Sequence, residues 1–260
     1  QNKITQQELA VVFYADDFVV LHKSLDVILK CKLAAEEWLK EMSLELKPSK
    51  TRISHTLTPY EENVGFDFLG FNIRQYPVGK HQSGCTGSGQ KLGFKTIIKP
   101  SKKKIALHIE SIGSIIDSYK TAPQEALISK LNPIIRGWCN YYSTVISKRV
   151  FSNCDHILSS QLRAWARYRT GKGDSRTKNK YWHYIEDRLI FSTKGGIRLL
   201  NHSDTPIKRH IKVRGNKSYF DGDVLYWSTR KGTHPELPNR VAMLLKKYKG
   251  RCPECGLMFA

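Results

Sequence analysis

Two adjacent aspartates, Asp16 and Asp17, stand between two short runs rich in apolar and β-branched residues. Such runs around a polar centre predict a β-hairpin with both carboxylates at its turn. Neighbouring carboxylates repel each other, and a divalent cation relieves that repulsion. Oxygen ligands on a tight turn suit Mg²⁺, and two such ions can activate a 3′-hydroxyl and stabilise a leaving pyrophosphate. An ordinary polar hairpin turn is the alternative explanation of a bare Asp-Asp pair.

A second candidate for chemistry is the pair Cys252 and Cys255, since a Cys-x-x-Cys pair is half of a tetrahedral Zn²⁺ site. The other two ligands would lie further along the chain, so we expect weak or no Zn²⁺ binding from this pair alone. Two unliganded thiols are the alternative. The remaining four cysteines are scattered through the sequence, which favours reduced thiols in the cytoplasm over a disulfide scaffold.

The charge is unevenly distributed along the 260 residues. There are 43 Lys and Arg against 23 Asp and Glu, a net charge of +20. Residues 1–75 hold 9 basic and 11 acidic residues, whereas the rest hold 34 and 12. This excess argues against an acidic disordered chain and an ordinary small-molecule enzyme, and favours a polyanion, above all nucleic acid. No apolar run is long enough to cross a membrane, so we expect no membrane partner.

Basic clusters after residue 90 alternate with aromatic residues, a combination typical of RNA binding because cations neutralise phosphates and rings stack on unpaired bases. A solvated helix face is the alternative for any single cluster. Trp165 also lies on the apolar stripe of its predicted helix, where core packing is the simpler explanation. The predicted RNA-binding residues are Lys102, Lys103, Lys104, Arg136, Arg163, Arg167, Arg169, Lys172 and Arg176.

The elements that must position these residues follow from periodicity. Helical spacing predicts one helix over 24–43, three helices within 105–165 and a last one over 237–248. Pro133 predicts a kink or break in the middle helix of the three. An aromatic hairpin is expected around Gly70, a Gly/Ser-rich loop after Pro77, and short mixed strands after residue 171. The predicted fold class is α+β.

The motifs resemble those of two connected protein families. Phe13-Tyr14-Ala15-Asp16-Asp17-Phe18 resembles the active-site motif of reverse transcriptases. Residues 44–51 and 66–71 resemble the segment after the palm helix and the primer-grip hairpin of the same enzymes. Residues 99–104, 131–138 and 140–142 resemble the maturase-specific thumb of group II intron-encoded proteins. The tail, 221–256, is similar to their bacterial DNA-binding region running into an HNH endonuclease.

This resemblance implies five regions. They are a partial palm (1–76), a basic loop (77–98), a helical maturase or thumb domain (99–190), a DNA-binding region (191–248) and the start of an HNH zinc module (249–260).

The resemblance also implies roles for palm residues. Asp16 and Asp17 would bind catalytic Mg²⁺, and Tyr14 would line the nucleotide or primer side. Lys50 would lie near the incoming dNTP, although a solvated lysine explains it equally well. The primer end would be positioned by Phe68, Leu69 and Gly70.

The implied partners are group II intron RNA, target DNA, and a fingers and palm portion in the same or another chain. Without that portion, we expect this chain alone to lack polymerase activity. The implied location is a ribonucleoprotein in the bacterial cytoplasm. Two alternatives remain open: an RNA-binding maturase or chaperone without catalysis, and a reverse transcriptase of a CRISPR-associated system.

Overall fold

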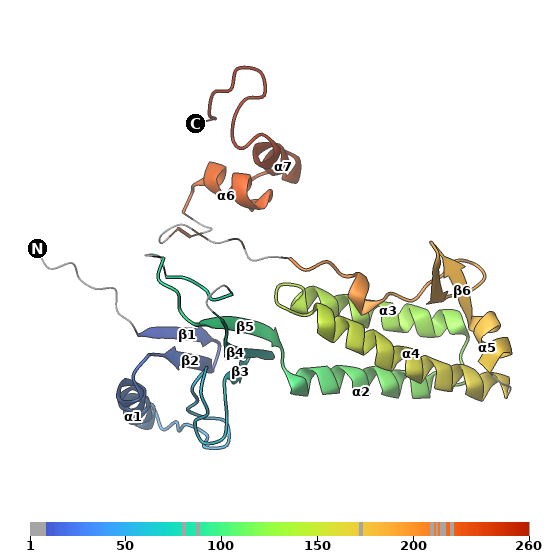
Figure 1. Cartoon of the computed structure of the whole chain (residues 1–260), viewed down its shortest axis with the longest axis horizontal. Coiled ribbons are helices and arrows are strands. Elements are labelled where there is room, and N and C mark those ends of the chain that lie inside the picture. The colour runs from blue at the N-terminus through green and yellow to red at the C-terminus, as the bar shows by residue number, and fades with distance from the viewer. Residues whose placement is uncertain are drawn as a thin grey trace, which may run out of the picture. The chain divides into compact units, whose positions relative to one another are not determined.

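The computed structural model divides into two compact units, Gln1–Ile207 and Lys208–Ala260. The residues that the structure describes are 9–79, 82–86, 89–171, 174–208, 211, 213, 217–218 and 221–259. The first unit contains antiparallel hairpins followed by a helical bundle (Figure 1), which confirms the predicted α+β class.

The first unit begins with a hairpin and a helix. Strands β1 (Ala10–Tyr14) and β2 (Asp17–Leu21) pair in antiparallel register, with Tyr14 opposite Asp17. Helix α1 (Leu25–Glu41) follows, as its spacing predicts, but it buries no residue. Among the described residues 9–99 only Gly65 is buried. This part of the unit therefore contributes almost nothing to the core.

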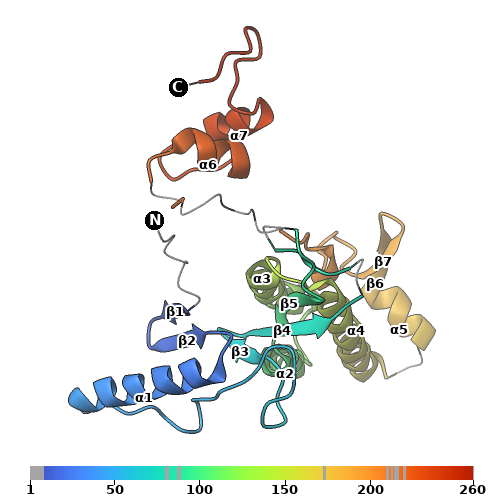
Figure 2. The same ribbon diagram turned by 60° about the vertical axis from the view of Figure 1, so that its left-hand side comes forward.

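A three-stranded antiparallel sheet comes next, in the order β3-β4-β5 (Figure 2). Its strands are β3 (Phe66–Phe68), β4 (Phe71–Pro77) and β5 (Phe94–Pro100). The hairpin around Gly70 is confirmed. The loop expected over 77–98 is shorter, because β5 pairs with β4 along its whole length, from Phe71 opposite Pro100 to Pro77 opposite Phe94.

The bundle consists of α2 (Lys102–Ser118), α3 (Gln124–Tyr142) and α4 (Lys148–Thr170). All three helices were predicted. The break expected at Pro133 is not present, because α3 continues through it. Proline removes the N–H that would bond the carbonyl four residues earlier. That carbonyl belongs to Ser129, which is exposed like Pro133, so water can satisfy it.

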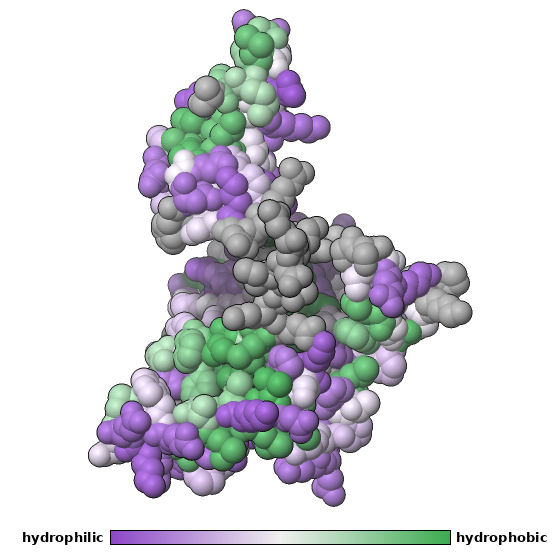
Figure 3. Space-filling view, turned by 90° about the vertical axis from the view of Figure 1, so that its left-hand side faces the viewer, coloured by the Kyte–Doolittle hydropathy of each residue, from purple (hydrophilic) through white to green (hydrophobic). Residues whose placement is uncertain are grey.

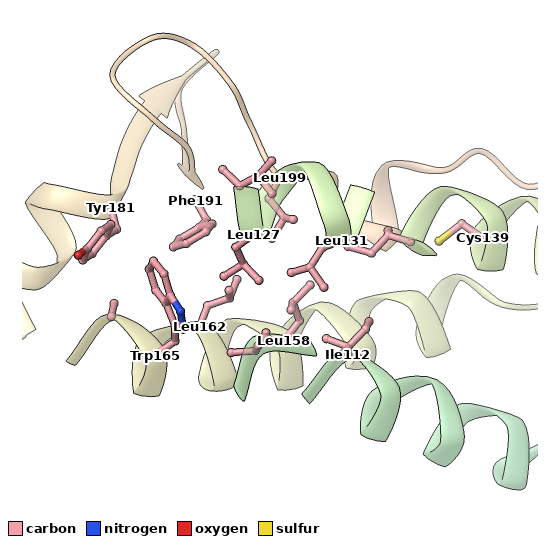
Figure 4. Close-up of a cluster of buried hydrophobic side chains, with 14 of the residues drawn as sticks. Ile112, Leu127, Leu131, Cys139, Leu158, Leu162, Trp165, Tyr181, Phe191 and Leu199 are labelled. Atoms are coloured by element: carbon pink, nitrogen blue, oxygen red, sulfur yellow. The ribbon is translucent and has the colours of Figure 1, made fainter. Parts of the chain in front are cut away.

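The core lies between these helices and is closed by the segment after α4. That segment comprises α5 (Asp174–Tyr181), the hairpin β6 (Trp182–Ile185) and β7 (Arg188–Phe191), and the short helix η1 (His202–Asp204). Figure 4 shows the indole of Trp165 directed toward Phe191 and Tyr181. Trp165 is 2% exposed, so its prediction as a core residue is confirmed.

The second unit is small. Its two helices, α6 (Val224–Lys231) and α7 (Asn239–Lys247), pack against each other, and α7 confirms the last predicted helix. Asp223 caps α6 by accepting a hydrogen bond from the Tyr226 amide. Across the described parts of both units, no helix combines the length and apolar character needed to span a membrane.

Candidate nucleic-acid interface

The aspartate pair lies at the tip of the first hairpin. Ala15, in a left-handed conformation (φ +52°), and Asp16 form the turn, while Asp17 begins β2 opposite Tyr14. All of these side chains are exposed, the Tyr14 ring by 64%. Carboxylate oxygens are ligands that Mg²⁺ accepts. Among the described residues, however, no group of three or more His, Cys, Asp or Glu side chains could enclose a metal ion, so these two carboxylates do not form a complete site.

Lys50 lies in a turn after α1, where its amide bonds the carbonyl of Lys47. Its side chain is exposed and contacts neither aspartate among the interactions described. Its role near a nucleotide therefore stays a prediction.

The turn at Leu69 and Gly70 packs against the helical bundle. Both residues have positive φ, +50° and +81°. The Tyr141 hydroxyl donates to the Leu69 carbonyl at 2.8 Å, and the Tyr142 hydroxyl donates to the Gly70 carbonyl at 3.2 Å. The Ser101 amide also donates to the Gly70 carbonyl, at 2.9 Å. The sequence indicated both the turn and the tyrosines as motifs but not that they contact each other.

Phe71 adds ring contacts between this turn and the bundle. Its ring stacks on Tyr141 at 5.1 Å and meets the edge of Tyr142 at 5.2 Å. Tyr142 is 3% exposed, and burial, followed by the neighbouring Tyr141, raises the pKa of its hydroxyl, so it acts as a neutral donor. Two of the three predicted primer-grip residues, Leu69 and Gly70, are thus held by the helical bundle, while Phe68 ends β3 beside them.

Three lysines occupy the first turn of α2. Lys102, Lys103 and Lys104 are exposed, and no acidic residue accompanies them there. The Ser101 hydroxyl caps the helix by accepting from the Lys104 amide at 3.3 Å. Cations at the positive end of a helix dipole are unfavourable for the helix itself. A bound anion would offset this cost, which makes the turn a candidate phosphate contact.

Helix α4 separates its cations onto different faces. Arg163 and Arg167 are exposed and four residues apart, so they share one face. Asp155, the only acidic residue of α4, points inward instead. Arg136, on α3, is also exposed. Lys172 and the side chain of Arg176 lie outside the described residues.

Arg169 is engaged within the domain. Its guanidinium lies 4.9 Å from the centre of the Trp165 ring. One terminal nitrogen donates to the carbonyls of Lys120 and Ala122, each at 2.8 Å, and Nε donates to the Tyr181 hydroxyl at 3.3 Å. These contacts hold the end of α4 to the α2–α3 connection. The spacing carried a signal for this, since residue 169 follows the buried Trp165 by one helical turn.

A buried polar network was not foreseen from the sequence. Asp155 accepts three hydrogen bonds, from His202 Nδ1 and the His202 amide at 2.7 Å and from the Ser203 amide at 2.9 Å. His202 Nε2 lies 2.9 Å from Nε2 of His108, whose ring stacks on Trp138 at 4.3 Å. The two partners of His202 are 47 and 94 residues away, so no local pattern connects them.

Burial controls ionisation in this network. Burial first, and then the nearby His202, lower the pKa of His108 from 6.5 to about 4. Burial raises the pKa of Asp155, but the hydrogen bonds from His202 and Ser203 outweigh it and leave the pKa below its ordinary value. Asp155 is thus a carboxylate and His108 a neutral ring at pH 7. The network fastens the segment carrying η1 to all three bundle helices.

In the second unit, Cys252 and Cys255 lie in a tight turn. The backbone amides of Cys255 and Glu254 donate toward the Cys252 sulfur and lower the pKa of this thiol. A stabilised thiolate is the form that binds metal. As noted, the described residues contain no group of three or more ligand side chains around this or any other point.

Comparison with protein families assigns two segments. Residues 105–183, which cover α2 to α5 and enter β6, match the group II intron maturase-specific domain. The chain contains a group II intron maturase domain. Residues 1–73 match the reverse transcriptase (RNA-dependent DNA polymerase) family, of which they form a C-terminal part. No curated protein matches the chain.

The predicted site residues are divided between the two matched segments. The maturase domain contains the arginines of α3 and α4, and the reverse transcriptase segment contains Asp16, Asp17, Lys50 and the turn at Gly70. The hydrogen bonds from Tyr141 and Tyr142 therefore join the reverse transcriptase segment to the maturase domain. Neither match reaches Cys252 and Cys255.

Proposed function

We propose that this chain is part of a group II intron reverse transcriptase and maturase, and that its maturase domain binds the intron RNA to promote splicing. The observation that carries the proposal is the charge arrangement of α4 within the matched domain. Arg163 and Arg167 face solvent, while the sole carboxylate of the helix, Asp155, is used internally. Such a face attracts phosphates, and no carboxylate of α4 on this face repels them.

In this proposal the RNA performs the splicing chemistry and the protein stabilises its folded form. The test is splicing of a group II intron transcript at a Mg²⁺ concentration too low for efficient self-splicing. Added protein should raise the splicing rate, and Arg163→Ala with Arg167→Ala should reduce that effect. A rate equal to that of RNA alone would argue against the maturase role.

We further propose that Asp16 and Asp17 bind Mg²⁺ for RNA-templated DNA synthesis once the rest of the palm and the fingers supply the remaining ligands. The support is an apolar face on β1, β2 and α1 that nothing in the described chain covers (Figure 3). Its exposed side chains include Phe13 at 71%, Leu33 at 58% and Trp38 at 60%. Contiguous exposed apolar surface of this kind marks an interface.

The test of this second proposal is primer extension on an RNA template with Mg²⁺ and dNTPs. The complete protein should extend the primer, Asp16→Ala with Asp17→Ala should abolish extension, and RNA binding should persist. A complete protein that binds RNA but never extends a primer would support the alternative of a maturase or chaperone without catalysis. Robust synthesis by the present chain alone would contradict the need for further palm residues.

For the second unit we propose contact with target DNA. Its helices end in basic residues, Arg230 and Lys231 on α6 and Lys246 and Lys247 on α7. Cys252 and Cys255 would supply half of a Zn²⁺ site whose other ligands come from outside the described residues. Zn²⁺ titration of the chain, followed by thiolate absorbance, tests the half-site: tight binding by Cys252 and Cys255 alone would contradict it.

A further inference from the structure

A pocket of about 350 Å³ lies between α2 and α4, which pack along one another (Figure 1). Its lining includes the buried Ile116 and Trp165 and the exposed Asp117, Lys120, Ala164 and Tyr168. None of these residues belongs to the cationic face of Arg163 and Arg167. The size lies within the range of small-ligand sites, and the combination of an apolar floor with a polar rim is typical of them.

We propose that this pocket binds a single unpaired base of the RNA held by the maturase domain. The inference rests on the proposed RNA-binding function and deepens it, because it assigns a base-recognition site beside the phosphate-binding face.

Tyr168 offers the stacking surface. Tyr168 is 66% exposed although it lies at the edge of a well-packed core, and Lys120 Nζ lies 5.9 Å from the centre of its ring. An exposed aromatic ring beside a cation suits a nucleotide, because the base stacks on the ring while the cation meets the phosphate. The buried Trp165 below it is fixed by a hydrogen bond from its Nε1 to the Tyr119 carbonyl at 2.8 Å.

The pocket also has acceptors for base N–H groups. Asp117, whose side chain is 69% exposed, pairs with Lys120 at 3.0 Å at the rim. Gln161 lies in the wall, and its Oε1 is buried with no hydrogen-bond donor among the described residues. An unsatisfied buried acceptor is costly. Rotation of the Gln161 amide toward the pocket would let an entering purine amino group supply the missing donor.

Gly113 makes room for that amide. A Cβ at this position would come within 2.9 Å of Gln161 Nε2, so any other residue would displace the side chain. The amide nitrogen reaches the Ile109 carbonyl at 3.5 Å, which leaves Oε1 as its unused atom. A ligand donor would complete the hydrogen bonding of this half-satisfied amide.

The test compares the whole chain's affinity for short oligoadenylate with its affinity for an abasic ribose-phosphate oligomer of the same length, by fluorescence anisotropy. The wild type should bind the oligoadenylate about 10-fold more tightly, as one stacked base contributes. Tyr168→Ala and the pocket-filling Ala164→Leu should abolish that difference, whereas Tyr168→Phe should keep it. Ala106→Leu, which adds the same bulk at an exposed site of α2 outside the pocket, should also keep it.

The outcomes separate this inference from the proposed function. If both oligomers bind but the difference survives Tyr168→Ala and Ala164→Leu, the pocket holds no base and the inference fails, while RNA binding stands. A pocket that instead takes an aromatic side chain of a protein partner gives this same result. If neither oligomer binds, the inference fails, whereas the proposed maturase function stands or falls on splicing of the intron transcript. Cross-linking of 6-thioguanosine-substituted RNA to the peptide containing Tyr168 would support the inference directly.

Discussion

The hydroxyl of Tyr142 donates a hydrogen bond to the carbonyl oxygen of Gly70, 72 residues earlier in the chain. This contact joins the reverse transcriptase segment to the maturase domain, and the bond from Tyr141 to Leu69 lies beside it. If the turn at Gly70 positions a primer end, its position is set by the maturase domain. Changes in α3 would then affect synthesis as well as RNA binding.

Tyr142→Phe should lower the free energy of unfolding by about 1 kcal/mol, the usual contribution of one hydrogen bond. The loss stays modest because the Gly70 carbonyl keeps its bond from the Ser101 amide. Gly70→Ala should cost more, since Gly70 has φ +81° and an added Cβ would lie 2.9 Å from the Tyr142 hydroxyl. Urea denaturation measures the stability of both variants. Equal stability of Gly70→Ala and the wild type would contradict the packing of the Gly70 turn against Tyr142.

Asp155→Ala should destabilise the chain by about 2–4 kcal/mol, because it leaves His202 and the Ser203 amide without their acceptor. The matched control is Asp204→Ala, which removes an exposed ion pair with Arg188. Such a pair contributes about 0–1 kcal/mol. Thermal unfolding should therefore show a clear gap between the two variants, and similar midpoints would mean that the buried network contributes little.

The stability of the first unit should rise with pH between about 4 and 6.5. His108 has a folded pKa of about 4 against 6.5 when unfolded, so in this window the unfolded chain binds more protons. The contribution of the uncharged His108 to the free energy of unfolding is complete above pH 6.5. At pH 5 about 2 kcal/mol of this contribution is lost. The pKa of Asp155 is also lowered, so protonation of this carboxylate in more acidic solution further lowers the stability of the first unit.

Urea unfolding at pH 5 and pH 7.5 measures this dependence. His108→Phe keeps a ring against Trp138 but cannot titrate, so it should flatten the dependence over this window. An unchanged slope in that variant would show that another group is responsible.

Arginines of α4 should divide into two classes. Arg163→Ala with Arg167→Ala should weaken RNA binding and reduce its dependence on salt concentration, with no change in the unfolding temperature. Arg169→Ala should instead lower the unfolding temperature, because it removes the bonds to the carbonyls of Lys120 and Ala122. If Arg169→Ala weakens RNA binding as strongly as the double variant while leaving stability intact, the assignment of Arg169 to contacts within the domain is wrong.

Local patterns were sufficient to predict the hairpins at Asp16 and Gly70 and the bundle helices, because each depends on short-range periodicity. They did not predict β5, whose residues follow a Gly- and Lys-rich stretch and become a strand only by pairing with β4. They also missed the network of His108, Asp155 and His202, since such contacts exist only after the helices pack.

For the candidate site, the sequence identified residue types better than it identified their surroundings. The exposed positions of Arg163 and Arg167 agree with the RNA-binding prediction, and the roles of both stay predictions. Arg169 has the same residue type and lies two residues further on, but its face of α4 turns inward. The pocket at Tyr168 could not be predicted, because it depends on how α2 and α4 pack.

Intron RNA binding by the maturase domain is tested by the equilibrium affinity of the chain for a group II intron RNA and for a structured RNA of equal length without intron sequence, over a range of salt concentrations. The proposed maturase function predicts tighter binding to the intron RNA, an affinity for it that falls steeply with salt, and a shallower salt dependence after Arg163→Ala with Arg167→Ala. Equal affinity for both RNAs, or a salt dependence unchanged in the double variant, would contradict it.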